Sequence, residues 1–387
     1  MNSPALSEQI KSLYERDLQS GVKPVAAADV PLSYETITPQ WLSQFVCAEN
    51  PAARVVDIRL GPADDASTNR RHLFLTYNRA GQDAGFPSSV FCKASHSLIT
   101  RLNMGLCGAA HGEVMFYTRL RGLLNIDAPH SYHANYDPES FASIVILEDL
   151  AGQVEFCTHT TEINWDRAAS MVCLMANYHA AIQEHPGLHA KTFQLPTFPE
   201  FWQKIVDRVY MEESSNNGFL ACEELIPRRL FERFPEVWPA TLRAVARHET
   251  LPQTLVHSDV HLKNWYVRGG DQMGLTDWHC CCAGNWSRDF AYAISVALTP
   301  EDRRNWEQDL LRLYLSEVEG RGGNVISFDE AWALYRQQLF TALAFWTNTL
   351  CPSELQPQDM QPQDAAREFI RRVACAIDDL DAFDDSE

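Results

Sequence analysis

Alternating hydrophobic and polar positions between residues 55 and 151 predict a region rich in strands. The runs VVDIRLGP (55–62) and RRHLFLTY (70–77) have the period of two that is typical of strands. The turn-forming stretch ADDASTN lies between them, so we expect an antiparallel hairpin with a polar tip. SSVFCKAS (88–95) predicts a short buried strand, and FASIVILEDLA (141–151) predicts a second one that runs into acidic residues.

Apolar positions spaced three and four residues apart predict helices elsewhere. HGEVMFYTRLRGLL (111–124) places Phe116, Leu120, Leu123 and Leu124 on one apolar stripe. After Ala151 this spacing dominates. It recurs in WDRAASMVCLMANYHAAIQ, RDFAYAISVAL, RNWEQDLLRLYLSEV, DEAWALYRQQLFTALAFW and AAREFIRRVACAI.

A small half rich in strands followed by a larger helical half predicts an α+β fold with two lobes. We expect residues 1–150 to form an N-lobe that carries a small antiparallel sheet, with residues 1–50 as a helical or irregular extension. Residues 151–387 should form a mainly helical C-lobe that ends in the acidic tail 378–387. The boundary is expected near Glu148 to Gly152.

Composition narrows the class of protein. The 387 residues carry a formal net charge of −19, which argues against nucleic-acid binding because a phosphate backbone requires a basic surface. Much of the negative excess lies in the terminal tail, which we expect to be solvated. Eleven cysteines, an odd number in a long chain, favour reduced thiols and a cytoplasmic protein. No apolar run approaches the roughly 20 residues that span a bilayer, so no membrane partner is expected.

The stretch LVHSDVHLKNWYV (255–267) sets polar side chains within an otherwise apolar sequence. Downstream, two short strand candidates flank RGGDQ, and Gly270-Asp271 is an acceptable two-residue hairpin turn. A turn centred there would place Asn264 opposite Asp277, with their Cβ atoms roughly 5 Å apart. Asp259 begins the same loop.

Oxygen ligands from two neighbouring strands are what a hard cation such as Mg²⁺ requires. Asp259, Asn264 and Asp277 therefore form a candidate site at one end of the hairpin. In the alternative interpretation, Asp259 and Asn264 cap the loop and Asp277 forms a turn.

The motif H-x-D-x-x-x-x-N (His257, Asp259 and Asn264), followed by a hairpin and Thr276-Asp277-Trp278, resembles the catalytic core of the aminoglycoside phosphotransferase and choline kinase-like family. The resemblance covers residues 54 to 350. It implies a protein-kinase-like fold and a small-molecule kinase that uses ATP and Mg²⁺ to phosphorylate a hydroxyl group.

The resemblance also implies roles for individual residues. Asp259 would accept or orient the proton of the substrate hydroxyl, while Asn264 and Asp277 would bind Mg²⁺. Lys93, on the same strand face as Phe91, would hold the α and β phosphates of ATP. Glu113 would pair with Lys93, and Ser67 would lie in the loop that binds the phosphates. Backbone groups from Glu148 to Leu150 would contact the adenine ring. Asp289 would brace the catalytic loop.

Three departures from the family pattern are visible. Ser258 replaces the glycine of H-G-D, His261-Leu262-Lys263-Asn264 stands where the family has H-P-G-N, and residues 61–69 lack a G-x-G-x-x-G motif.

Two alternatives to a kinase stay open. One is a metal-dependent hydrolase with a zinc site drawn from His257, Asp259, His261, His279 and Cys280, and the other is a nucleotide-binding pseudokinase.

The acceptor is not fixed by the sequence. An acidic chain fits an aminoglycoside or a choline-like amine. The aromatic residues beyond Arg288, namely Trp306, Trp332, Phe345 and Trp346, fit a bulkier hydroxylated metabolite if they line the acceptor pocket.

Overall fold

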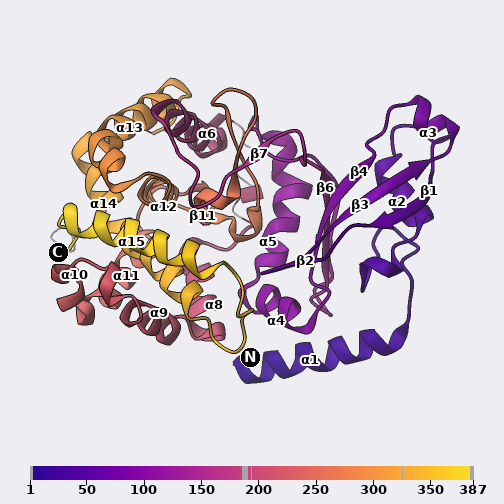
Figure 1. Ribbon diagram of the computed structural model, residues 1–387, viewed down its shortest axis with the longest axis horizontal. Helices are drawn as coiled ribbons and strands as arrows, with labels where there is room; N and C mark the ends of the chain where they lie inside the picture. Colours follow the sequence, from indigo (N-terminus) through magenta and orange to yellow (C-terminus); the bar gives the residue numbers. More distant parts are fainter. Residues whose placement is uncertain (1–2, 185–190, 193, 325, 384–387) are drawn as a thin grey trace. The chain divides into compact units, whose positions relative to one another are not determined.

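Antiparallel strand pairing organises the first of two compact units into which the chain divides (Figure 1). The computed structural model describes residues 3–184, 191–192, 194–324 and 326–383. The first unit contains Met1–Arg121, Pro129–Ala151 and Glu354–Pro357, and the second contains Gly122–Ala128, Gly152–Ser353 and Gln358–Glu387.

The sheet of the first unit has the strand order β1-β3-β4-β6-β5, with β2 paired to β3 at one end. All of its pairings are antiparallel. The strands are β1 (Val55–Leu60), β2 (Asp64–Asp65), β3 (Asn69–Tyr77), β4 (Ser89–Ala94), β5 (Ser131–Tyr136) and β6 (Ser143–Glu148). The helices are α1 (Ser3–Ser20), η1 (Tyr34–Thr36), α2 (Pro39–Val46), α3 (Arg79–Asp83), α4 (Leu98–Cys107), α5 (Ala109–Met115), η2 (Phe116–Leu120) and η3 (Arg121–Leu123).

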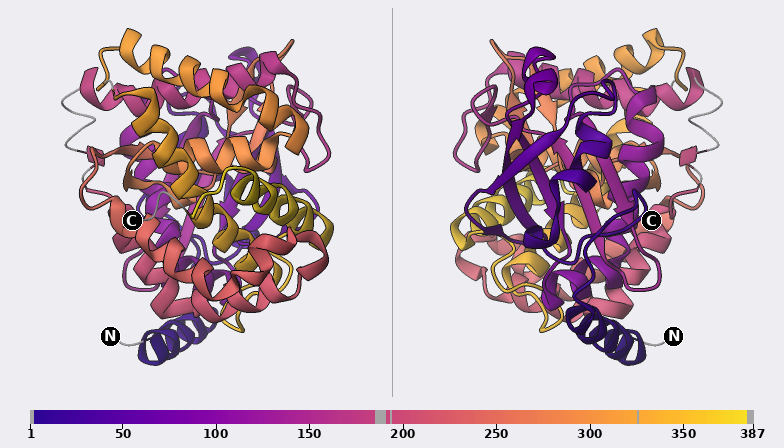
Figure 2. Two further views of the ribbon diagram at one scale, coloured as in Figure 1. Left: turned by 90° about the vertical axis from the view of Figure 1, so that its left-hand side faces the viewer. Right: turned by 90° about the vertical axis from the view of Figure 1, so that its right-hand side faces the viewer.

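Helix α2 covers one face of this sheet, as the right-hand view of Figure 2 shows. Thr38 caps the helix by accepting a hydrogen bond from the Trp41 N–H group. Trp41 then packs, fully buried, in one core with Leu73 and Ile144 of the sheet. Burial of such large apolar side chains contributes about 1.5–3 kcal/mol for each one.

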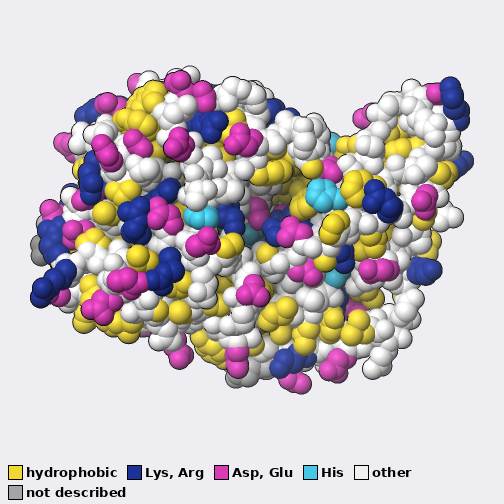
Figure 3. Space-filling model, in the orientation of Figure 1, with side chains coloured by type: hydrophobic (Ala, Val, Ile, Leu, Met, Phe, Trp, Pro, Cys, Tyr) yellow, Lys and Arg dark blue, Asp and Glu magenta, His cyan; other side chains and the backbone are white. Residues whose placement is uncertain are grey.

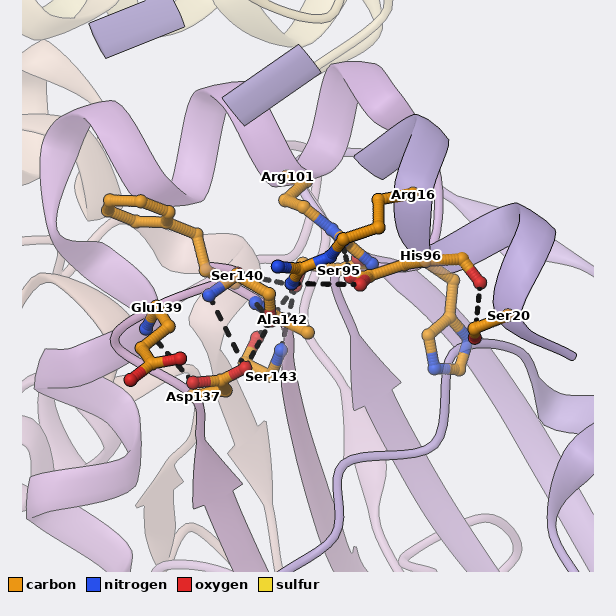
Figure 4. A network of polar contacts seen from close by, with 12 residues as sticks. Arg16, Ser20, Ser95, His96, Arg101, Asp137, Glu139, Ser140, Ala142 and Ser143 are labelled. Carbon is orange, nitrogen blue, oxygen red and sulfur yellow. Dashed lines mark hydrogen bonds and ion pairs between the residues drawn. The ribbon is translucent and has the colours of Figure 1, made fainter. Parts of the chain in front are cut away.

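A polar network fixes the ends of β4 and β6 (Figure 4). The Ser95 hydroxyl accepts hydrogen bonds from the backbone N–H and the hydroxyl of Ser143, at 2.9 and 3.1 Å. Arg101 of α4 is 1% exposed and donates to Asp17 of α1 at 2.6 Å. Because a buried guanidinium needs a charged partner, this pair holds α1 against α4.

The predicted hairpin, the strand around Lys93 and the strand before Glu148 are confirmed. The predicted helix at 111–124 is present, but the assignment of Leu123 to its apolar stripe is wrong, because that side chain is 40% exposed. The helix changes its winding to a π-turn at η2 and then to a 3₁₀ turn at η3. This change rotates Leu123 away from the buried side chains of Phe116 and Leu120.

The second unit is mainly helical, with two small antiparallel sheets of order β10-β9-β7 and β11-β8. Its helices are α6 (Trp165–Glu184), α8 (Phe198–Val209), α9 (Met211–Leu220), η4 (Glu223–Leu225), α10 (Arg228–Glu232), α11 (Phe234–Arg247), η5 (Leu262–Asn264), η6 (Trp278–Cys280), α12 (Ser287–Ala297), α13 (Pro300–Gly320), α14 (Phe328–Leu350) and α15 (Gln363–Asp379). Its strands are β7 (Glu155–Phe156), β8 (Thr254–Val256), β9 (Trp265–Val267), β10 (Met273–Leu275) and β11 (Cys282–Gly284). A unit with an antiparallel sheet and a mainly helical unit confirm the α+β fold class.

Charges on the second unit are mixed rather than segregated. On the face that Figure 3 shows, Asp and Glu side chains are interspersed with Lys and Arg over its helices. Within the described residues, none of the helices combines the length and apolar character needed to cross a membrane.

The acidic tail is only partly described, since residues 384–387 lie outside the described part of the chain. The expectation of a solvated tail is wrong at its start. Asp378 and Asp379 form the last turn of α15, where Asp378 accepts a hydrogen bond from Arg229 at 2.9 Å. Asp379 pairs with Arg304 at 2.7 Å and also with the buried Arg303. These carboxylates therefore hold α15 to its neighbours.

Candidate active site

The loop that follows β8 is held in a backbone conformation unusual for its sequence. Ser258 has a φ of +66°, in the left-handed region that favours glycine. Its N–H group donates to Asp289 at 2.7 Å, and its carbonyl accepts a hydrogen bond from the buried Arg288 at 2.8 Å. The peptide is thus fixed on both sides, which explains how serine stands where the family has glycine.

Asp289 anchors this loop from α12 by accepting hydrogen bonds from the loop itself and from α6. Besides Ser258, its carboxylate accepts from the His257 N–H at 2.7 Å, the Tyr178 hydroxyl at 2.6 Å and His179 Nε2 at 3.3 Å. Burial would raise the pKa of Asp289, but the hydrogen bonds and nearby imidazoles hold it below its usual value. The predicted bracing role of Asp289 is confirmed.

The Asp259 carboxylate is oriented by two neighbours. Asn264 Nδ2 donates to the Asp259 carbonyl at 2.7 Å and to Asp259 Oδ2 at 3.2 Å. The Tyr292 hydroxyl donates to the other carboxylate oxygen, Oδ1, at 3.2 Å. The side chain of Asp259 is 13% exposed, so it is held within the unit and still reaches solvent.

The predicted register of the hairpin is wrong by one residue. Strands β9 and β10 pair Val267 with Met273 and Trp265 with Leu275, and the Thr276 N–H donates to the Asn264 carbonyl. The cause is the turn, which contains three residues, 269–271, rather than two, because the Arg268 N–H donates to the Gln272 carbonyl at 2.8 Å. Asn264 therefore faces Thr276, and Asp277 follows as the next residue.

Asp277 lies at the start of η6 with a φ of +66°. Like Ser258, it is a residue other than glycine in the left-handed region, and such strained positions cluster at functional sites. Its Oδ1 pairs with Nδ1 of His279. Burial would lower the pKa of His279, but the neighbouring Asp277 and Cys280 raise it above the usual value.

Asn264 and Asp277 have the chemistry that Mg²⁺ requires. The Asn264 amide nitrogen is used by Asp259, so the side chain offers its oxygen Oδ1 as a ligand atom. Asp277 adds carboxylate oxygens. Hard oxygen donors of this kind are the ones that Mg²⁺ prefers over imidazole or thiolate.

In the first unit the structure brings Lys93 and Glu113 together. Lys93 Nζ on β4 lies 2.6 Å from Oε1 of Glu113 on α5. Both residues are buried, at 4% and 2% exposure. A buried lysine beside a carboxylate is a charged donor in a fixed position, whereas a surface lysine would be held far less rigidly.

The other predicted nucleotide residues lie around the same sheet. Ser67 is half-buried in the tip between β2 and β3. Glu148 ends β6, and its side chain accepts a hydrogen bond from the His130 N–H at 3.3 Å. Leu150 follows it and is 4% exposed.

The aromatic residues singled out from the sequence do not share one environment. Trp346 on α14 packs against His261 with ring centroids 5.1 Å apart. Trp306 instead contacts Trp165, and Trp332 stacks on Phe328.

Sequence reasoning missed Tyr292 and Arg288 as partners of the catalytic loop. For Tyr292 a signal is available, because it lies three residues after Asp289 and so on the same face of that helix. The adjacent Arg288 has no such spacing signal.

Comparison with models of known protein families finds a match. Residues 109–323 match the model of the phosphotransferase enzyme family. Among curated proteins, none matches this sequence.

Solved structures similar to this chain include three kinases or phosphotransferases. The GDP complex of aminoglycoside 2'-phosphotransferase-IIIa has 9% identity and a TM-score of 0.48, over 90% of this chain and 100% of that one. A microcompartment-associated aminopropanol kinase has 13% identity and a TM-score of 0.47, over 85% and 94%. An ethanolamine kinase from Plasmodium vivax has 11% identity and a TM-score of 0.44, over 96% and 93%.

The family match spans more than half of the chain and includes the catalytic loop, Asp277 and Asp289. The resemblance inferred from the motif is therefore confirmed, and the chain belongs to the phosphotransferase enzyme family as a small-molecule kinase.

Proposed function

We propose that this enzyme transfers the γ-phosphate of ATP, with Mg²⁺, to a hydroxyl group of a small molecule. The observation that carries the proposal is the fixed carboxylate of Asp259, which Asn264 and Tyr292 orient at the end of a braced loop. Phosphoryl transfer requires little covalent work from the protein, and positioning of the acceptor is the main task.

In this proposal Asp259 accepts a hydrogen bond from the substrate hydroxyl and orients its oxygen for attack. Tyr292 and Asn264 keep the carboxylate from rotating, so the geometry is set before the acceptor binds. Asn264 and Asp277 would hold Mg²⁺, which when bound neutralises charge on the phosphate oxygens.

The nucleotide would bind to the first unit. Lys93, fixed by Glu113, would donate to the α and β phosphates, and Ser67 would donate from the loop before β3. Backbone groups at Glu148 and Leu150 would meet the adenine ring. In domain terms, residues 1–150 would form the nucleotide-binding lobe and residues 151–387 the lobe with the catalytic loop and acceptor site.

The acceptor would be an aminoglycoside, a choline-like amine or a hydroxylated metabolite of similar size. Trp346 and Phe369, both buried, pack around His261, two residues from Asp259, and fix its position beside the loop. We also propose a cytoplasmic location, because an odd number of cysteines, eleven in a chain of 387 residues, favours reduced thiols.

The zinc hydrolase alternative loses one of its ligands. His257 Nδ1 accepts a hydrogen bond from the Asp259 N–H at 3.2 Å, and Nε2 donates to the Thr276 carbonyl at 2.9 Å. With both nitrogens engaged, His257 supports the loop rather than offering a lone pair to a metal.

The test is ADP release from Mg-ATP across a panel of hydroxylated compounds, with Asp259→Asn as the inactive variant. Asp271→Asn is the matched control, because Asp271 lies in the hairpin turn and pairs with Arg167 at 3.0 Å. We expect turnover on one compound class that Asp259→Asn abolishes and Asp271→Asn retains. Absence of both turnover and Mg-ATP binding would favour the pseudokinase or hydrolase alternative instead.

A further inference from the structure

Asp259, His279 and Cys280 form a candidate set of metal ligands, and the proposed kinase reaction uses only Asp259 among them. One ligand atom from each of Asp259, His279 and Cys280 lies within 4.8 Å of the other two. Around a tetrahedral Zn²⁺, with bonds of about 2.0–2.3 Å, ligand atoms would lie roughly 3.3–3.5 Å apart. Side-chain adjustment of about 1 Å therefore suffices to close the set on an ion.

We propose that Asp259, His279 and Cys280 bind Zn²⁺, and that the bound zinc inhibits the enzyme by occupying the carboxylate of Asp259. The inhibitory part rests on the proposed function. The binding part rests on the ligand set alone.

Strand pairing explains why residues distant in sequence meet here. Strands β8 and β11 are antiparallel, with Val256 opposite Cys282. The segment that leaves β8 contains Asp259, and the segment that enters β11 contains His279 and Cys280. Both segments therefore emerge from the same end of the two-stranded sheet.

The donor types select zinc over magnesium. Thiolate and imidazole are ligands for borderline-soft cations, whereas Mg²⁺ takes oxygen ligands. Cys280 is 7% exposed and lies beside a carboxylate and an imidazole, so a metal there is largely shielded from water. Binding would release the thiol proton of Cys280 to solvent, because zinc takes the thiolate.

Neighbouring groups already support two of the ligands. Nδ1 of His279 pairs with Asp277, and a carboxylate on one ring nitrogen is the common support for a histidine that ligates through the other. Asp259 keeps the hydrogen bond from Tyr292 to Oδ1. These contacts fix ligand orientation before the ion arrives.

His261 lies close enough to serve as a fourth metal ligand. It is 4% exposed, and its Nε2 lies 3.6 Å from Oδ2 of Asp259. Its Nδ1 is buried without a hydrogen-bond partner in the described part of the chain. An imidazole that is buried and incompletely satisfied beside a ligand carboxylate is consistent with a metal position.

Zinc at this position would compete with catalysis in two ways. It would take the carboxylate that orients the acceptor hydroxyl, and it would retain the existing pair of His279 with Asp277, a proposed Mg²⁺ ligand. Inhibition should therefore weaken as the Mg²⁺ concentration rises.

The first experiment measures binding without turnover. Full-length protein is dialysed against Zn²⁺, and Co²⁺ is used as a spectroscopic substitute whose thiolate charge-transfer band reports a bound cysteine. We expect one tightly bound ion and a thiolate band that Cys280→Ser removes. His279→Asn should weaken binding about tenfold or more. Cys281→Ser is the matched control, since Cys281 is the next residue and equally a buried thiol.

The second experiment measures inhibition. Each variant's ADP release with zinc is compared with its own zinc-free rate, and urea unfolding confirms that the variant is folded. We expect zinc to inhibit the wild type and Cys281→Ser, and to inhibit Cys280→Ser about tenfold less strongly.

The outcomes separate the two proposals. No stoichiometric zinc, or a cobalt band that Cys281→Ser removes and Cys280→Ser retains, overturns the ligand set. Bound zinc with unaltered ADP release overturns the inhibitory role. Absence of any ADP release would count against the proposed function, while the cobalt spectrum would still decide the metal site.

Discussion

Replacement of Asp289 by asparagine should destabilise the second unit by about 3 kcal/mol. The carboxylate accepts the N–H groups of His257 and Ser258 and the Tyr178 hydroxyl, and an amide offers only one oxygen. At least one buried N–H group is then left without an acceptor, at a cost of about 2 kcal/mol. Loss of charge assistance in the remaining backbone bond adds about 1 kcal/mol.

The assay is urea unfolding of the Asp289→Asn protein against the wild type. Asp309→Asn on α13 is the matched control, because Asp309 is exposed and pairs only with Arg312 on its own helix among the described residues. We expect the control to change stability by less than about 0.5 kcal/mol. A loss below about 1 kcal/mol for Asp289→Asn would refute the bracing role.

The difference in stability between the wild type and Asp289→Asn should depend on pH. The pKa of folded Asp289 is lowered, so its contribution is present above the unfolded value of about 3.9 and is lost as the pH falls through the folded pKa. The difference between the two proteins should therefore shrink below about pH 4. A difference that stayed constant to lower pH would contradict an ionised Asp289.

Three further changes have defined outcomes. Lys93→Met should lower kcat/KM for Mg-ATP about a hundredfold, measured by steady-state kinetics, because it removes the donor that Glu113 fixes. Ser258→Gly should raise the free energy of unfolding by about 1 kcal/mol in urea titrations, since glycine tolerates a φ of +66° and the buried serine hydroxyl has no partner among the described residues. His248→Asn should keep an acceptor for the Asn285 N–H group and should remove the pH dependence of stability that His248 causes. Burial lowers the pKa of His248 to about 4, so the wild type should lose about 2 kcal/mol from this group between pH 7 and pH 5, compared by urea unfolding at each pH.

The catalytic loop could be predicted from the sequence because its signal is local. Polar residues at fixed spacing within an apolar frame mark His257, Asp259 and Asn264 without knowledge of the rest of the chain. The longer strands and helices were predictable for the same reason, since their period extends over many residues. Strands of two or three residues, such as β7, β8 and β11, are too short to show one.

The hairpin register failed on one physical detail. Turn preference favoured a two-residue turn at Gly270-Asp271, but Arg268 pairs with Gln272 and the turn contains the three residues 269–271. A shift of one residue changes which side chains face each other, so the expected pairing of Asn264 with Asp277 was lost.

The supporting contacts could not be predicted because they come from distant elements. Tyr178 and Tyr292 reach the loop only once α6 and α12 are packed. The proximity of Asp259 to Cys280 likewise depends on the pairing of β8 with β11. Nothing in the local pattern encodes these distances.

The hydrogen bonds to Asp289 affect the order in which parts of the second unit unfold. The amides of His257 and Ser258 can exchange with solvent only when the Asp289 carboxylate releases them, and that carboxylate is also bound by Tyr178 of α6. Because one carboxylate joins the loop to both α6 and α12, we expect the loop to open together with these helices rather than by local fraying. Hydrogen exchange at these two amides should therefore follow the most protected helices of the second unit, so the catalytic loop belongs to the last part to unfold.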